Sequence, residues 1–298
     1  MWYNVGMKAG IIAINKESGM TSHDVVARLR RLLKEKKIGH AGTLDPDVTG
    51  VLPIAVGKAT RLIEYMQESG KVYRGRVMLG VSTTTEDASG DVVEKVLVSG
   101  VTEAMIDEAM VSFIGEIRQV PPMYSAVRVN GRHLYEYARS GETVERPSRV
   151  VTIYDFRRLG PMTSQNGTVW FDFEVVCSKG TYVRTLSVDL GEKLGFPAHM
   201  SMLVRQSAAG MDLEESLTLG ELEDLVSASD WSFLKPLESG LGNLKQVMIG
   251  EANRDAIGYG RAIQIETTDD YVAALYEGKL VAILEKRGNW YKPHKVFL

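Results

Sequence analysis

Residues 39–50 read GHAGTLDPDVTG, and this glycine-rich stretch between two apolar segments is the most informative segment of the sequence. Glycines at 39, 42 and 50 allow the backbone to approach a ligand closely. Pro46 disfavours helical geometry at Asp45, which predicts a carboxylate presented from extended backbone. Such a carboxylate could act as a nucleophile. The simpler interpretation is a turn, in which Asp-Pro pairs are common.

A basic amphipathic helix is predicted immediately before this loop. Residues 21–24, Thr-Ser-His-Asp, supply capping side chains, and apolar residues from Val25 to Leu33 recur at helical spacing. Residues 28–37 hold six bases and one acid, a local charge of +5. A basic face of this kind favours binding of a polyanion, with a solvated helix face as the alternative. Its bases are Arg28, Arg30, Arg31 and Lys34.

The rest of the chain predicts an α+β fold. Apolar runs at 10–14 and 50–56 indicate buried strands, and residues 71–79 alternate with Tyr73, Val77 and Leu79 on one face. Long strands are expected at 149–158 and 168–177. Helices are expected after Thr102, over 183–194 and after Thr218.

Two segments depart from this α+β pattern. Residues 121–147 are rich in Arg and Tyr and contain the hairpin signal Asn130-Gly131, which predicts an excursion from the sheet. The tail from about Leu244 has short strand-like runs separated by glycines, which suggests a small β-barrel. We therefore predict a catalytic domain over 8–238, with an insertion at about 121–150, and a second domain over 244–298.

Composition limits the class of protein. The chain has 298 residues, a net charge of −3 and one cysteine, Cys177, so an internal disulfide is excluded and a cytoplasmic setting fits. Residues 212–238 hold eight acids and one base, or −7, which leaves +4 for the remainder. We expect no membrane segment, no nucleotide cofactor and no catalytic metal, because the corresponding motifs are missing from the sequence. Residues 1–6 are expected to be an extension without chemistry.

Residues 177–184, Cys-Ser-Lys-Gly-Thr-Tyr-Val-Arg, are the second candidate for a functional site. A strand ends there and a helix begins, so Arg184 could pair with a carboxylate and Tyr182 could stack on a base. Taken alone, the segment equally fits a helix start with a surface arginine. Tyr73 equally fits a core tyrosine.

Four motifs, taken together and in order, resemble the TruB family of tRNA pseudouridine synthases. They are residues 15–22, residues 39–50, Val72-Tyr73-Arg74 and residues 178–184, and the similarity runs from about Gly10 to about Arg205. The resemblance implies a mixed, mainly antiparallel sheet flanked by helices, an inserted RNA-gripping thumb and a C-terminal PUA-like barrel. It implies uridine in the TΨC loop (T-arm) of tRNA as substrate, with no cofactor, metal or obligate protein partner.

The resemblance also implies roles for individual residues. Asp45 matches the nucleophilic aspartate, Tyr73 a tyrosine implicated in proton transfer, and Arg184 the arginine that pairs with the aspartate. Glu17 stands where relatives usually have proline after the motif lysine, so the rigidity of that turn is in question. Residues expected to bind the substrate are His40, Tyr182, Leu203, Lys16 and Lys179. Residues expected to grip the RNA backbone are Arg28, Arg30, Arg31, Lys34, Arg128, Arg132 and Arg139.

Two other functions would also explain part of the sequence. A non-catalytic RNA-binding protein would explain the basic helix and the tail, but it would not need Asp45, Tyr73 and Arg184 together. An RNA-guided relative that modifies ribosomal RNA would need protein partners and usually lacks the inserted thumb. The excursion at 121–147 therefore favours the stand-alone enzyme.

Overall fold

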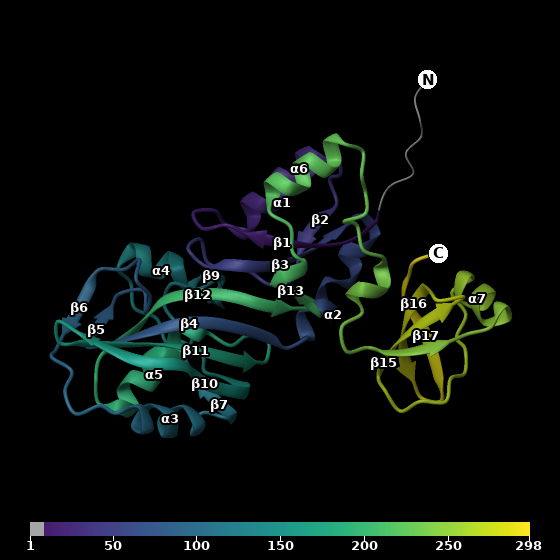
Figure 1. The fold of residues 1–298 in the computed structure, drawn as a ribbon. Helices are drawn as coiled ribbons and strands as arrows, with labels where there is room; N and C mark the ends of the chain where they lie inside the picture. Colours follow the sequence, from purple (N-terminus) through teal and green to yellow (C-terminus); the bar gives the residue numbers. More distant parts are fainter. Residues whose placement is uncertain (1–8) are drawn as a thin grey trace. The chain divides into compact units, whose positions relative to one another are not determined.

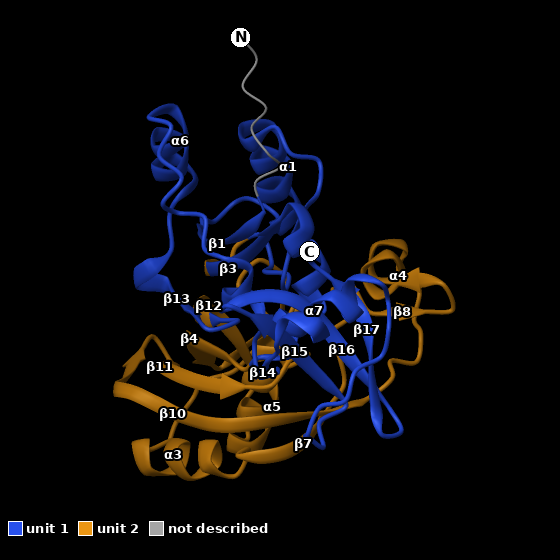
Figure 2. Ribbon diagram, turned by 90° about the vertical axis from the view of Figure 1, so that its right-hand side faces the viewer, with its two compact units in different colours: residues 1–46, 51–69, 208–298 blue, residues 47–50, 70–207 orange. Residues whose placement is uncertain are grey.

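The computed structural model describes residues 9–298, and the proposed extension of residues 1–6 lies outside them (Figure 1). The chain forms two compact units, shown in different colours in Figure 2. Unit 1 contains the described residues up to Pro46, Val51–Ser69 and Ala208–Leu298, and unit 2 contains Asp47–Gly50 and Gly70–Ser207. Both units combine helices with strands, which confirms the predicted α+β class.

Unit 1 begins with strand β1 (Gly10–Lys16), followed by helix α1 (Ser22–Leu33). The predicted cap is present as a capping box, in which Asp24 N donates to Thr21 Oγ1 (3.1 Å) and Thr21 N donates to the Asp24 carboxylate (2.9 Å). Strand β2 (Ile38–His40) then runs antiparallel to β3 (Thr49–Val56). The predicted loop over 39–50 was therefore too long at both ends, because backbone pairing takes in Gly39, His40, Thr49 and Gly50.

The loop that remains between β2 and β3 is fastened by the buried side chain of Lys16. This lysine has no exposed surface (0%), and its ammonium donates to three carbonyl oxygens. These belong to Glu17 (2.8 Å), Met20 (2.7 Å) and Pro46 (2.9 Å). Pro46 O also accepts from Gly19 N (3.0 Å). The turn after β1 and the residue after Asp45 are thus held by one cation.

The middle of unit 1 packs an apolar core around short helices. Helices η1 (Gly57–Leu62) and α2 (Ile63–Glu68) follow β3, and β13 (Met211–Asp212), η2 (Leu213–Glu215), α6 (Leu219–Ser227) and η3 (Leu237–Gly240) come from the later part of the chain. Thr218 caps α6 through the predicted capping box with Glu221. Helix α6 contacts α1, so the acidic segment lies against the basic helix within this unit.

The tail of unit 1 forms a four-stranded sheet in the order β14-β15-β16-β17, with helix α7 beside it (Figure 1). Its elements are β14 (Lys245–Met248), α7 (Glu251–Gly258), β15 (Tyr271–Tyr276), β16 (Lys279–Arg287) and β17 (Trp290–Val296). The pairings found among the described strands give an open sheet and not the closed barrel that was predicted. Successive side chains of a strand point to opposite faces of the sheet, so the apolar strands give this sheet two apolar faces. Val272 and Ala274 pack beneath α7, whereas Ala273 and Leu275 join the core of unit 1.

Unit 2 is built on a twisted sheet of long strands in the order β12-β4-β11-β10-β7. Strand β4 (Lys71–Leu79) pairs antiparallel with β11 (Thr168–Cys177), and β10 (Arg149–Gln165) lies antiparallel between β11 and β7 (Gly115–Gln119). Strand β12 (Ala198–Ala208) runs parallel to Thr49-Gly50, so the sheet is mixed but mainly antiparallel, as expected. Strands 71–79 and 168–177 have the predicted bounds, whereas β10 continues seven residues past Arg158.

Two helices cover one face of this sheet. Helices α3 (Glu103–Val111) and α5 (Val183–Leu194) pack against each other, and α3 also contacts β10. Thr102 caps α3 and Gly195 (φ +82°) ends α5, both as predicted. Alternate residues of β11, Phe171, Phe173 and Val175, are fully buried on this face. The start of α5, which carries the second candidate motif, is therefore fixed by core packing.

The predicted excursion is present as a small subdomain of unit 2. Strands β8 (Arg128–Val129) and β9 (Arg132–His133) form a hairpin whose turn residues, Asn130 and Gly131, have positive φ angles of 51° and 83°. Helix α4 (Leu134–Ser140) follows. Strand β4 is followed by a second hairpin, in which β5 (Val81–Thr83) pairs with β6 (Val92–Lys95) and residues 84–91 form the turn. Over residues 9–298, no helix has the length and hydropathy required to cross a bilayer.

Replacing Gly50 by alanine tests the backbone packing beside the loop. Gly50 has φ +106°, and a Cβ there would lie 2.2 Å from Arg205 O. Both left-handed geometry and a backbone clash then oppose the substitution, so Gly50→Ala is expected to lower the unfolding free energy by about 3 kcal/mol or more in urea. Gly160→Ala is the control, because φ is +69° but the space is open, and it should cost about 1 kcal/mol. Equal losses would exclude the clash.

Replacing Lys16 by methionine tests the buried cation. Methionine keeps most of the volume but leaves the carbonyls of Glu17, Met20 and Pro46 without this donor. We expect the unfolding free energy to fall by about 3 kcal/mol, measured by urea denaturation. Lys36→Met, at an exposed position of the same unit, should change it by less than about 0.5 kcal/mol. A Lys16→Met protein as stable as this control would show that the hydrogen bonds do not hold the loop.

Candidate active site

Asp45 is half-buried between two fixed residues of unit 1. Leu44, which is 4% exposed, donates its backbone N–H to Ser22 Oγ (2.9 Å) and accepts from that hydroxyl at its carbonyl (3.2 Å). Pro46 is fixed on the other side through Lys16. Because both neighbours are anchored, the backbone at Asp45 is held in one place, which preorganises the position of the residue.

Two other predicted substrate-binding residues belong to unit 1. His40 is the last residue of β2, lies opposite Ile54 in the β3 register and is half-buried. Ala41 N donates to Pro53 O (2.9 Å), so the chain leaves β2 in a defined direction. Lys16 is buried, and its ammonium donates to protein carbonyls inside the unit, so its contact with the substrate stays a prediction.

In unit 2, Tyr73 lies on β4 opposite Val175 of β11 and is 7% exposed. It shares the buried side of the strand with Val77 and Leu79. The next residue, Arg74, is on the other side and pairs with Glu174 (2.7 Å). This burial fits a core tyrosine, and the role of Tyr73 in proton transfer stays a prediction.

Arg184 is a buried residue of unit 2 and not the surface arginine that the sequence alone allowed. It is 5% exposed and lies in the first turn of α5. Its Nη1 donates to Thr85 O (3.0 Å) and its Nη2 to Tyr124 O (2.9 Å), and the Asp87 carboxylate lies 3.8 Å from Nη1. A buried guanidinium with two fixed carbonyl acceptors is aimed by the surrounding backbone. No motif indicates that Thr85 or Tyr124 would supply these contacts.

Tyr182 is held at the N-cap of α5 by a glutamine that sequence reasoning missed. Gln119, 1% exposed, accepts from Tyr182 N (3.0 Å) and donates to Tyr182 O (3.2 Å). The guanidinium carbon of Arg149 lies 5.3 Å from the centre of the Tyr182 ring. Lys179 is an exposed residue of the turn before the helix.

Leu203 of β12 approaches β4 near Tyr73. A Cβ built on Gly75 would lie 2.9 Å from Leu203 Cδ1, so glycine is needed for this close packing. Tyr73, Tyr182, Arg184, Leu203 and Lys179 all belong to unit 2, whereas Asp45, His40 and Lys16 belong to unit 1.

The bases of α1 differ in how far they are engaged within the protein. Arg28 pairs with Glu223 of α6 (2.7 Å), and Arg30 donates to Ile38 O (3.0 Å). The hydrogen bond from Arg28 lowers the pKa of the Glu223 carboxyl. Arg31 and Lys34 are exposed. The acidic segment thus neutralises part of the predicted RNA-binding face.

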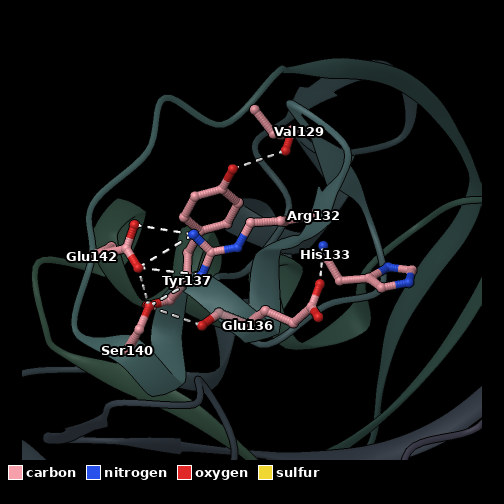
Figure 3. Close-up of polar contacts among 7 residues, drawn as sticks. All are labelled: Val129, Arg132, His133, Glu136, Tyr137, Ser140 and Glu142. Atoms are coloured by element: carbon pink, nitrogen blue, oxygen red, sulfur yellow. Dashed lines mark hydrogen bonds and ion pairs between the residues drawn. The ribbon is translucent and has the colours of Figure 1, made fainter.

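The bases of the 121–147 excursion have side-chain partners too, several of them drawn in Figure 3. Arg132 donates to Glu142 (3.2 Å) and its guanidinium carbon lies 4.2 Å from the Tyr137 ring centre. Tyr137 OH donates to Val129 O (3.1 Å), which ties α4 to the hairpin. Arg128 donates to His133, and Arg139 lies over Tyr135. The excursion is an ordered basic and aromatic surface, which suits binding of nucleic acid.

Family models match most of the chain. One, described as TruB family pseudouridylate synthase (N terminal domain), matches residues 30–183. Another, described as tRNA pseudouridylate synthase B C-terminal domain, matches residues 184–242. The tail from 243 onward lies beyond both matches.

Relatives and solved structures agree with these models. The chain is 60% identical to tRNA pseudouridine synthase B of Streptococcus sanguinis over 97% of this chain and 99% of the relative, and 58% identical to that of Streptococcus agalactiae serotype III over 98% and 100%. Among solved structures, a Cbf5-Nop10-Gar1 complex has a chain with TM-score 0.73 and 28% identity, and an H/ACA RNP bound to a substrate RNA has one with TM-score 0.72 and 27% identity. Each covers 97% of this chain and 85% of the solved chain. The chain therefore belongs to the TruB family of pseudouridylate synthases.

Proposed function

We propose that this chain isomerises the uridine at position 55, in the TΨC loop of tRNA, to pseudouridine. Near full-length similarity to relatives named tRNA pseudouridine synthase B supports tRNA as the substrate. The observation that carries the proposal is the anchored Asp45, held between Leu44 and Pro46 in the family's own motif. A catalytic carboxylate needs this kind of fixed position, whereas an ordinary turn does not.

The reaction requires the nucleotide to leave its stack, because the C–N glycosidic bond is not accessible within a folded loop. Unstacking costs a few kcal/mol, which phosphate contacts and aromatic stacking can offset. The exposed bases of α1 and of the 121–150 thumb are the proposed phosphate contacts. Tyr182 and Leu203 are proposed to line the uridine pocket, and His40 to fill space near the base stack that the nucleotide leaves. The exposed Lys179 is proposed to meet the RNA at its edge.

In the proposed mechanism, Asp45 acts as an ionised carboxylate at the sugar C1′, either by direct attack or by assisting elimination. The base then rotates and rejoins the sugar through carbon, with Tyr73 moving a proton. Attack at C6 of the base is the alternative first step. Arg184 is proposed to pair with Asp45 and keep it ionised, since an arginine partner opposes the effect of burial on a carboxylate. Its own fixed acceptors, Thr85 O and Tyr124 O, support this assignment.

Lys16 is better assigned to positioning than to direct substrate contact. Its buried ammonium already serves carbonyls on both sides of the loop. This arrangement also answers the question raised by Glu17 in place of proline, because the turn obtains its rigidity from the lysine and from the Gly19 N to Pro46 O bond.

The proposed domains are a catalytic domain over 8–238, with its thumb at about 121–150, and a PUA-like RNA-binding domain over 244–298. The proposed enzyme is cytoplasmic and works on the T-arm without a cofactor, a guide RNA or an obligate protein partner. The alternative is a guided enzyme like those in the ribonucleoprotein structures. The ordered thumb and the high identity to tRNA-modifying relatives favour the stand-alone form.

The test is release of tritium from a T-arm stem-loop labelled at uridine C5, with purified protein and no guide RNA. Wild-type protein should release tritium in multiple turnovers. Asp45→Asn should lose at least about a thousandfold in rate while binding the stem-loop within about threefold of wild type, because the amide keeps the shape but cannot act as the carboxylate. Asp47→Asn, an exposed neighbour in the same loop, is the matched control and should remain active.

Each outcome of the assay supports or excludes one of the hypotheses. Retained turnover in Asp45→Asn would exclude Asp45 as the catalytic carboxylate. Wild-type protein that binds the stem-loop but releases no tritium would support a non-catalytic RNA-binding protein. Release only after guide RNA and partner proteins are added would support the RNA-guided alternative.

A further inference from the structure

Glu86 has an unusual conformation in unit 2, in the turn between β5 and β6. Its φ angle is +64°, in the left-handed region that non-glycine residues seldom occupy. Asn and Asp are the residues that tolerate this region best, and glutamate has no comparable advantage. Strained backbone of this kind persists where surrounding contacts enforce it, and it gathers at functional sites.

Three hydrogen bonds enforce the conformation. Glu86 N donates to Thr83 O (3.3 Å), and Glu86 O accepts from Met200 N of β12 (3.0 Å). The carboxylate accepts from Thr185 Oγ1 of α5 (2.9 Å). Thr185 is 7% exposed, so this side-chain bond joins the turn to the interior of the helix.

The neighbours of Glu86 contact the neighbour of Thr185. Thr85 O accepts from Arg184, and the Asp87 carboxylate lies 3.8 Å from the same guanidinium. Residues 85–87 therefore face residues 184–185 as two short segments joined by three contacts. Of these three, the Glu86–Thr185 hydrogen bond is the one that does not involve Arg184.

Burial of the Glu86 carboxylate is electrostatically unfavourable. Burial raises the pKa of Glu86, and the Thr185 hydrogen bond and then the charges of Arg184 and Arg146 oppose that rise, while Asp87 adds to it. Asp189, one turn along α5, also has a pKa raised by burial, to about 6, with smaller contributions from Glu192 and Glu86. Two acids are thus kept close to one helix where apolar residues would pack without this penalty.

We propose that Glu86 is a positioning residue for Arg184, holding the 85–87 turn against α5 so that the guanidinium keeps its direction. The inference rests on the proposed function, since it assumes that Arg184 serves the reaction. Glu86 acts through Thr185 and the backbone of the turn, and it touches neither substrate nor reacting atoms. A purely structural glutamate would contribute to folding stability but not to the catalytic rate constant.

The key variant is Glu86→Gly, because glycine adopts φ +64° without strain while the whole side chain, with its carboxylate, is removed. In the tritium-release assay we expect kcat to fall about tenfold to a hundredfold, the loss typical of a small misplacement of a catalytic group. The KM for the stem-loop should stay within about threefold of wild type, since no RNA contact is removed. Glu86→Gln should keep kcat within about threefold, because its amide oxygen can still accept from Thr185.

Two further variants separate positioning from stability. Asn166→Ala places alanine at a left-handed position (φ +52°) in an exposed turn of the same unit, so it should lower Tm without changing kcat. Thr185→Val removes the partner hydroxyl. If the two groups act through one contact, the Glu86→Gly and Thr185→Val double variant should lose no more in kcat than the worse single variant.

The inference is overturned if Glu86→Gly turns over like wild type, if its effect falls on KM alone, or if the double variant loses the product of the two single effects. A structure of the Glu86→Gly protein provides a readout that does not depend on activity. The Arg184 to Thr85 O hydrogen bond should be lost or lengthened, and an unchanged bond would exclude the proposed role. Inactive wild-type protein would refute the proposed function, whereas an active wild type with an unaffected Glu86→Gly variant would refute only this inference.

Discussion

One ammonium group, that of Lys16, fixes the geometry on which the candidate site depends. The charged ammonium is fully buried, and burying a charge is energetically unfavourable unless each of its N–H donors finds an acceptor. Three backbone carbonyls from residues 17, 20 and 46 meet that requirement, and in doing so they join the end of β1 to the residue after Asp45. The backbone at Asp45, next to Pro46, is restrained by the same contacts. A loop rich in glycine would otherwise be the most mobile part of the unit, because glycine has the largest backbone freedom to lose.

Much of the fold could be predicted because its signals are local. Strands 71–79 and 168–177 alternate cleanly between core and surface, and the helix over 183–194 carries its own glycine stop, so their bounds were confirmed. The loop prediction over 39–50 was too long because β2 forms only through pairing with β3, a contact that composition does not encode. The tail strands were likewise visible, but whether a short sheet closes into a barrel depends on which edges pair, and the single sequence contains no information on that.

The candidate residues could be found only partly from the sequence. Asp45 and Arg184 stand in motifs whose order carries the resemblance, so their identity was accessible. Their supports were not, because each support comes from a distant segment. Lys16 reaches Pro46 across thirty residues, and Arg184 reaches Thr85 across ninety-nine. Gln119 and Glu86 belong to no motif and are recognised only by burial and by contacts with residues 182 and 185. Candidate catalytic residues can thus be predicted here because each stands in a local motif. The residues that position them cannot, because they come from distant segments.

The charged segments are visible in the sequence, but the ion pairs between distant residues are seen only in the structure. The sequence shows a basic helix and an acidic segment as separate features of a chain with net charge −3. In the structure, Arg28 of the first pairs with Glu223 of the second, and in the thumb Arg132 pairs with Glu142. Both pairs are substantially exposed, so each contributes little to stability. Their more important effect is on binding. A phosphate that displaces one of these carboxylates gains less than a phosphate that meets an exposed base such as Arg31, because the intramolecular pair must first be broken. Within α1, the exposed Arg31 and Lys34 are therefore more available to a phosphate than Arg28, which is already paired with Glu223.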